Sequence, residues 1–160
     1  MTDNAHPSGL PVGSTPQGQM VAAHWGRLSL TVDGAMQALR AKGVAPEQAT
    51  ADDLHFIDMN HMGGLAATDA LAELARIAAG QQVLDVGAGV GGPARRLARH
   101  YGASVWGVEL SEAVYETAVQ LTALVGLADQ VRFRQGSGLA LPFADGTFDV
   151  VVMQHVAMQI

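Results

Sequence analysis

The residues best suited to chemistry lie in a glycine-rich stretch, Asp85-Val86-Gly87-Ala88-Gly89-Val90-Gly91-Gly92, and at an acid further along, Glu109. Gly87, Gly89 and Gly92 fit the spacing G-x-G-x-x-G, in which missing side chains let a ligand approach backbone N–H groups where a helix starts. An acid about 20 residues further on suits the hydroxyls of a ribose. The pattern predicts a nucleotide-like ligand and, taken alone, permits NAD.

Asp85 shifts the balance between the possible ligands, because it precedes the glycines where a strand is expected to end. A carboxylate at this place would repel a pyrophosphate, whereas it could position the cationic amino group of a methionine moiety. Charge therefore favours a sulfonium ligand that carries an amino group over a dinucleotide.

Three segments resemble class I S-adenosylmethionine-dependent methyltransferases. Residues 83–92 resemble motif I of that family, and residues 107–111 resemble the acidic end of its second strand. Residues 135–151 resemble the segment written G-D-A-x-x-L-P-F-x-D-x-x-F-D-V-V. The resemblance covers roughly residues 58–160 and is closest to the methyltransferase 11-type branch with quinone, tocopherol, sterol and sarcosine methyltransferases. It implies S-adenosylmethionine as the cofactor and in-line methyl transfer to a small molecule.

The resemblance also implies roles for individual residues. His155 falls beside the methyl-transfer position as a candidate base, and Ser137 replaces an Asp that usually accepts a hydrogen bond from the adenine amino group. Ser accepts more weakly than a carboxylate. Asp58 and His61 are expected to pack the cap, with His61 as the alternative candidate base, and no metal is expected. The implied cofactor contacts are Asp85, Gly87, Ala88, Gly89, Gly91, Glu109, Leu110, Gly136, Ser137, Gly138 and Gln154.

Short β-branched runs alternate with helical stretches after Gly80, which is typical of βαβ units. Strands are expected at residues 83–86, 104–108, 131–134 and 148–153, with helices at 93–100 and 111–125. Right-handed crossovers would place these strands in one parallel sheet with helices on both faces. The predicted fold is α/β, a Rossmann-like doubly wound sheet with an amino-terminal helical cap.

The amino-terminal part divides into two predicted regions. Residues 1–19 are rich in Pro, Gly, Ser and Thr and are expected to form a flexible arm. Residues 20–67 should form a helical cap. It begins with an apolar stripe over 20–41, with Gly26 and Gly34 as the expected break points, and continues with helix starts at Pro46 and Thr50. Thr68 is expected to cap the next helix, Gly80 to end it, and residues 68–160 to form the cofactor domain.

Composition excludes several classes of protein. The 160 residues suit one domain, and the net charge of −6 provides no field that would attract nucleic acid or an anionic membrane. The absence of cysteine excludes disulfides and thiolate metal sites. No leader or apolar run of membrane-spanning length is evident, so we expect a cytoplasmic protein that acts on a small-molecule acceptor.

The predicted sheet provides about four of the seven strands that the family has, so the domain is expected to be incomplete. Residues 150–153 form a continuous apolar run suited to burial on both faces, and an open edge there would invite self-association. Two alternatives stay open at this point. One is an NAD-binding Rossmann oxidoreductase, and the other is a non-catalytic fragment that pairs with another chain.

Overall fold

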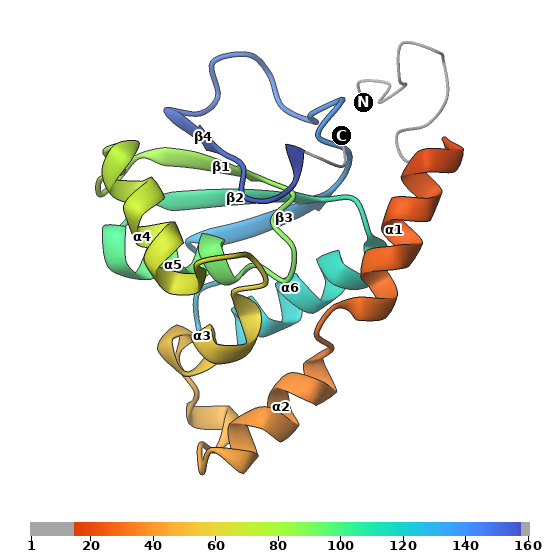
Figure 1. Ribbon diagram of the computed structural model, residues 1–160. Coiled ribbons are helices and arrows are strands. Elements are labelled where there is room, and N and C mark those ends of the chain that lie inside the picture. Colours follow the sequence, from red (N-terminus) through yellow and green to blue (C-terminus); the bar gives the residue numbers. More distant parts are fainter. Residues whose placement is uncertain (1–14, 158–160) are drawn as a thin grey trace.

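The computed structural model describes residues 15–157, and its centre is a sheet of four parallel strands (Figure 1). The strands are β1 (Gln82–Val86), β2 (Ser104–Glu109), β3 (Val131–Gln135) and β4 (Val150–Val152). Each neighbouring pair runs parallel, as the alternation of strands and helices predicts. The α/β class and the Rossmann-like parallel sheet are therefore confirmed.

The strand order, β3-β2-β1-β4, decides where a ligand can bind. The chain steps outward from β1 through β2 to β3, and then returns to the other side of β1 to form β4. In open parallel sheets, ligands bind beyond the carboxyl ends of the strands at the point where the order reverses. The turn that leaves β1 at this point is the glycine-rich stretch 87–92.

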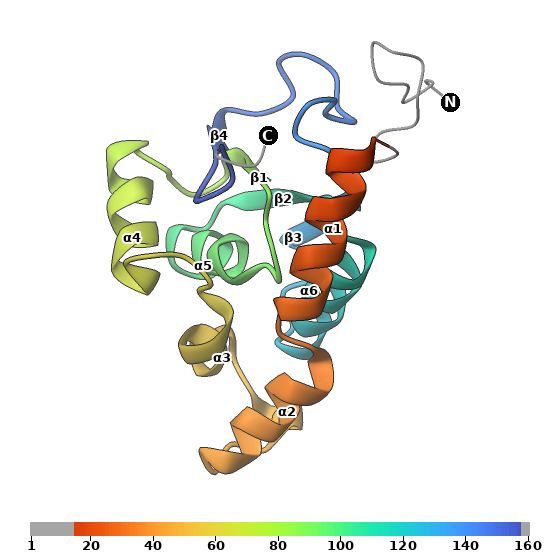
Figure 2. The same cartoon turned by 45° about the vertical axis from the view of Figure 1, so that its right-hand side comes forward.

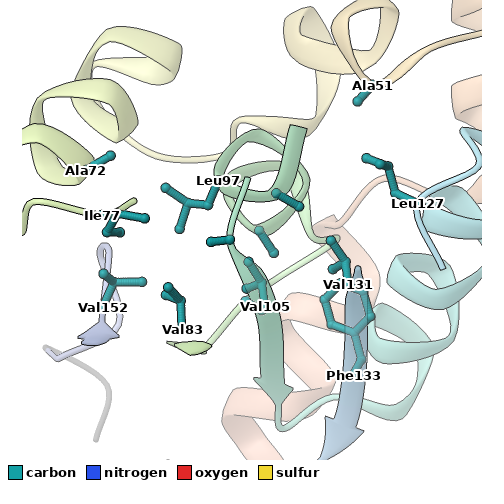
Figure 3. Close-up of a cluster of buried hydrophobic side chains, with 14 of the residues drawn as sticks. Ala51, Ala72, Ile77, Val83, Leu97, Val105, Leu127, Val131, Phe133 and Val152 are labelled. Carbon is teal, nitrogen blue, oxygen red and sulfur yellow. The ribbon is translucent and has the colours of Figure 1, made fainter. Parts of the chain in front are cut away.

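Helices cover one face of the sheet, namely α4 (Gly64–Leu74), α5 (Gly92–Tyr101) and α6 (Glu112–Leu124) (Figure 2). Their apolar sides meet the sheet in the core drawn in Figure 3, which includes Ala72, Val83, Leu97, Val105, Val131 and Val152. The opposite face is covered by the segment between β3 and β4, through Phe143 and Phe148. Helices on this second face do not occur within residues 15–157.

The cap consists of α1 (Pro16–Leu28), α2 (Val32–Ala41), the short η1 (Pro46–Gln48) and α3 (Ala51–Asp58). It shares a second core with α6 and the glycine-rich turn, formed by Ala35, Leu39, Ala49, Leu54, Val90, Val114 and Leu121. Because Val90 belongs to that turn, the cap packs directly on the loop where a ligand is expected. None of the helices within residues 15–157 is long and apolar enough to cross a membrane.

Boundaries in the cap differ from the predicted ones. α1 begins at Pro16, inside the predicted arm, because Thr15 accepts a hydrogen bond from Gly18 N at 3.1 Å and Pro16 fits the first turn. The rest of the arm, residues 1–14, lies outside the described residues. The predicted long helix breaks at residues 29–31 and not at Gly26 or Gly34, because Thr31 caps α2 there.

The prediction that Thr68 caps a helix ended by Gly80 is wrong. α4 runs from Gly64 to Leu74, so Thr68 lies in its middle and is completely buried, and the predicted boundary at residue 67 falls inside this helix. The Thr68 hydroxyl donates to Gln154 Oε1 at 3.2 Å and lies 3.1 Å from His61 Nε2. A buried hydroxyl needs partners, and tertiary contacts supply them here in place of a helix end.

The strand β4 lies at the edge of the sheet and pairs with β1 alone among the described residues. Val151 is 59% exposed, so the expected burial of this strand on both faces does not occur within residues 15–157. An unpaired edge of this kind leaves backbone N–H and C=O groups open to another strand.

Candidate functional site

A cavity of about 220 Å³ opens beyond the carboxyl ends of the strands, where the strand order reverses. Its walls come from the turn after β1, the end of β2, the segment after β3, the segment after β4 and helix α1. Nine of the predicted site residues line it, namely Gly87, Gly89, Glu109, Leu110, Gly136, Ser137, Gly138, Gln154 and His155. The structure therefore brings together segments that are up to 68 positions apart, from Gly87 to His155.

A second, smaller cavity of about 60 Å³ adjoins the first and shares Asn60, Gly87, Gly89, Val90 and Gln154 with it. We call it the annex. Two more predicted residues, Asp85 and Ala88, line the annex and not the main cavity. Asp58 and His61, which were expected to pack the cap, line it as well.

Gly91 is the one predicted cofactor contact that lines neither cavity. It precedes α5 with a φ of +85°, and a Cβ there would lie 2.6 Å from Phe133 Cζ and 2.8 Å from Arg95 Nη1. Its lack of a side chain lets the turn close against β3 and α5. The structure therefore gives Gly91 a packing role, and its contact with a ligand stays a prediction.

Gly91→Ala is expected to lower the free energy of unfolding by about 1–3 kcal/mol, because it combines a left-handed backbone with a close contact. Gly89→Ala is the matched control. Gly89 also has positive φ, but no atom lies within 4 Å of its ideal Cβ. Gly89→Ala should therefore reduce stability less than Gly91→Ala and reduce ligand affinity more. Denaturant unfolding and ligand titration of both variants measure the two effects, and a larger loss of stability in Gly89→Ala would contradict the assignment.

Glu109 ends β2 and closes the glycine-rich turn with its carboxylate. Oε2 accepts a hydrogen bond from Gly89 N at 3.0 Å, and Oε1 accepts one from Ser111 N at 2.9 Å. Burial raises the pKa of Glu109, while the backbone N–H groups of Ser111, Gly89 and Leu110 lower it in part. Each carboxylate oxygen has a second acceptor position, so Glu109 is still able to receive hydroxyl groups from the cavity.

Asp85 is a buried carboxyl group that forms no ion pair within residues 15–157. It is 2% exposed, and its Oδ2 has no hydrogen-bond partner among the described residues. Burial, with a contribution from the nearby Glu109 carboxylate, raises the pKa of Asp85 to about 7. Such a group in a cavity wall is typical of a functional site, because it costs stability that folding alone would not demand.

The shifted pKa of Asp85 predicts how stability depends on pH. The carboxyl group of Asp85 loses its proton near pH 4 in the unfolded chain and near pH 7 in the folded chain. The destabilisation caused by this buried group therefore grows between these pH values and is complete above pH 7. Asp85→Asn is therefore expected to raise the free energy of unfolding at pH 8 by roughly 2–4 kcal/mol and much less at pH 4. Denaturant unfolding at both pH values measures this, and an equal effect at the two would contradict the assignment.

The segment after β3 forms a turn at the edge of the main cavity. Gly136 N donates to Glu109 O at 2.9 Å, and Ser137 Oγ accepts from Leu139 N at 3.1 Å. The Ser137 hydroxyl therefore keeps its own proton available as a donor. The turn sits beside the acidic end of β2, as expected for a site that holds adenine next to ribose.

The segment after β4 brings Gln154 and His155 to the cavity. Gln154 accepts the hydrogen bond from Thr68 in α4, and the His155 ring lies 6.1 Å from the His61 ring, measured between centroids. His155 has a backbone φ of +59°, a value that residues other than glycine rarely adopt. Backbone conformations of this kind are common at functional sites, and the role of His155 near the substrate stays a prediction.

Several lining residues were missed by sequence reasoning. Val21 and Trp25 of α1 form part of the cavity wall. The apolar stripe in the sequence predicts only that the helix face carrying them is buried. Val156 also lines the cavity and packs directly on Gly87. No local pattern reveals which cavity a buried helix face will border, and among residues 15–157 no cluster of acids and histidines could hold a metal ion.

Comparisons with known proteins agree with this architecture. Residues 83–160 match the methyltransferase domain family. A probable chloroplastic tocopherol O-methyltransferase of Oryza sativa subsp. japonica is 46% identical over 71 residues, which are 44% of this chain and 20% of that protein. The chain thus spans only a small part of the length of that relative.

Solved structures show the same fold. A S-adenosylmethionine-dependent methyltransferase from Thiobacillus denitrificans, in complex with S-adenosyl-L-homocysteine, superposes with a TM-score of 0.54 at 27% identity, over 68% of this chain and 43% of that one. Geranyl diphosphate C-methyltransferase from Streptomyces coelicolor A3(2) superposes with a TM-score of 0.64 at 24% identity, over 89% and 55% of the two chains. Residues 83–160 therefore match a methyltransferase domain, and this part of the chain is similar to S-adenosylmethionine-dependent methyltransferases.

Proposed function

We propose that this chain binds S-adenosylmethionine and that the protein containing it transfers the methyl group to a small-molecule acceptor. The observation that carries the proposal is the pairing of the glycine-rich turn with Glu109 in the wall of one cavity at the reversal of strand order. The turn offers space where side chains are missing, and Glu109 offers a carboxylate for ribose hydroxyls. NAD, the sequence-based alternative, finds no support in the comparisons.

Each part of the cofactor has a group to receive it. Glu109 and Leu110 would bind the ribose, and Ser137 and Gly138 would contact the adenine. Asp85, whose buried Oδ2 lacks a partner among the described residues, would accept from the α-ammonium group. The open space at Gly89 would let the amino-acid end approach the backbone of the turn that also contains Gly87 and Ala88. Gln154 would complete the wall on the side of the methyl group.

The sulfonium supplies an electrophilic methyl carbon, and the reaction is a displacement in which the acceptor–carbon bond forms as the carbon–sulfur bond breaks. The electron pair stays on sulfur, and S-adenosylhomocysteine leaves. The contribution of the protein is to align the reacting atoms and exclude water. Where the acceptor is a hydroxyl or a carbon acid, its proton would pass to His155, since histidine titrates near neutral pH.

Calorimetric titration of S-adenosylhomocysteine into the chain tests the proposal, with far-UV circular dichroism to establish folding and NAD as the control ligand. We expect one site for S-adenosylhomocysteine and none for NAD. Binding of NAD, or no binding of S-adenosylhomocysteine by a folded chain, would overturn the proposal.

The acceptor is proposed to have an apolar body. The main cavity has apolar residues in its wall, namely Val21, Trp25, Val114, Leu139 and Val156. The names of similar proteins include tocopherol, sterol and geranyl diphosphate methyltransferases, which indicate acceptors of that kind. A role without nucleic acid or membrane partners and a cytoplasmic location stay predictions from the sequence.

The open edge of β4 is proposed to support self-association. Val151→Lys places a charge on this exposed strand and is expected to shift the chain toward the monomer, because charged side chains oppose edge-to-edge pairing. Val119→Lys, at an exposed position of α6 away from the edge, is the matched control. Light scattering measures the mass of each. A wild-type chain that stays monomeric at high concentration would contradict this proposal.

A further inference from the structure

Two buried acids from distant parts of the chain reach the annex. Asp58 ends α3 in the cap, and Asp85 lies in β1 of the sheet. Each is 2% exposed, and Asp58 Oδ1 and Asp85 Oδ2 have no hydrogen-bond partner among the described residues. A buried carboxylate oxygen without a partner is costly, and two of them in the wall of one cavity indicate a ligand that donates to both.

Asp58 is held in place by two residues outside the cap, Gly92 and Arg95. A Cβ at Gly92 would lie 2.9 Å from Asp58 Cγ and closer still to Asp58 O, so Asp58 fits only because Gly92 has no side chain. Arg95 Nη2 donates to Asp58 Oδ2 at 3.0 Å and to Val90 O at 2.8 Å. One guanidinium therefore ties the cap acid to the glycine-rich turn and leaves Asp58 Oδ1 without a hydrogen-bond partner among the described residues.

The charges around the annex favour a cation. Arg95 compensates one carboxylate, Asp58, through an ion pair. Among residues 15–157, no ion pair compensates Asp85. A ligand with one positive charge would balance the second carboxylate, and an ammonium group with its three N–H donors would suit both open oxygens.

The size of the annex limits the cation to a small group. Its volume of about 60 Å³ leaves room for a few groups the size of water, since one such group needs roughly 10–15 Å³. It adjoins the main cavity along Gly87, Gly89 and Gln154, so a cation there can belong to a ligand whose larger part lies in the main cavity.

We propose that Asp58, acting with Asp85, receives the α-ammonium group of the cofactor, so that the cap takes part in recognising its amino-acid end. The proposal rests on the proposed function. Asp58 is then a specificity-determining residue in addition to a packing residue, and the cap must be docked on the glycine-rich turn before the site is complete.

A cycle of two ligands and two chains tests the role of Asp58. The ligands are S-adenosylhomocysteine and its analogue in which hydrogen replaces the amino group, titrated by calorimetry into the wild-type chain and Asp58→Asn. We expect loss of the amino group to weaken wild-type binding at least tenfold. Asp58→Asn should weaken binding of S-adenosylhomocysteine about tenfold and leave binding of the analogue within a factor of two. Asp52→Asn, on the same helix but outside the annex, should change neither.

The outcomes separate this inference from the function on which it rests. Equal weakening of both ligands by Asp58→Asn would show a purely structural role and overturn the inference alone. A folded wild-type chain that binds neither ligand would overturn the proposed function. If Asp58→Asn does not fold, the ¹³C shift of the Asp58 carboxyl in the wild-type chain decides. It should move with S-adenosylhomocysteine and not with the analogue, and equal responses would overturn the inference.

Discussion

Glu109→Ala is expected to weaken binding of S-adenosylhomocysteine by about 100-fold. Two effects contribute. The carboxylate that would accept the ribose hydroxyls is lost, and the N–H groups of Gly89 and Ser111, now 3.0 and 2.9 Å from its oxygens, lose their acceptor. A hydrogen bond to a charged group contributes roughly 1.5–3 kcal/mol, and each 1.4 kcal/mol is about a tenfold change in affinity.

Calorimetry on three variants separates these effects. Glu109→Gln keeps the shape and one acceptor oxygen, so it should fall between wild type and Glu109→Ala. Glu112→Ala removes an exposed acid from the first turn of α6 and should bind like wild type. Wild-type affinity in Glu109→Ala would remove Glu109 from the cofactor site.

Arg95→Met is expected to destabilise the fold by about 3–5 kcal/mol, the usual cost of removing one partner from a buried ion pair. Arg95 is 1% exposed and donates to Asp58, Val90 O and Thr122 Oγ1, which lie in α3, the glycine-rich turn and α6. Its loss leaves the Asp58 carboxylate buried without a counter-charge. Met fills a similar volume, so the effect reports mainly on charge and hydrogen bonding.

Denaturant unfolding measures the effect of Arg95→Met against two comparisons. Arg99→Met changes an exposed residue of the same helix and should stay within about 0.5 kcal/mol of wild type. Adding Asp58→Asn to Arg95→Met removes the uncompensated charge and should restore part of the lost stability. If the double variant is no more stable than Arg95→Met, the ion pair is not the cause of the loss.

Much of the sheet could be predicted from the sequence, because its signals are local. Short runs with β-branched residues, such as 83–86 and 131–134, have the length of strands, and the structure places β1 and β3 there. Pro93 near the start of α5 and Gly102 after its end are helix signals that depend only on neighbouring residues. Thr68 shows the limit of such signals, because a hydroxyl before an apolar run looks the same whether it caps a helix or lies buried within one.

Part of the candidate site could likewise be predicted from local spacing, and part depends on packing. The spacing of Gly87, Gly89 and Glu109 predicted residues that line one cavity, because the carboxyl ends of neighbouring parallel strands meet at the same edge of a sheet. Gly91 belongs to the same glycine-rich stretch, yet it lines neither cavity, and Phe133 and Arg95 occupy the place where its side chain would be. A glycine motif specifies which positions have no side chain. The packing around each glycine determines whether the space beside it is open to a ligand or filled by another side chain.

The sequence by itself determined the α/β class, the resemblance to methyltransferases and the glycine-rich turn with its acid, since each depends on residue type and short spacing along the chain. Only the tertiary structure decided that Asp58 meets Arg95 across 37 positions, that α1 borders the cavity, and that Asp85 is buried with an open oxygen. Contacts between distant segments leave no periodic trace, because either partner alone resembles an ordinary surface or core residue. Burial, and with it the pKa of Asp85, exists only once the cap, the turn and the sheet are packed together.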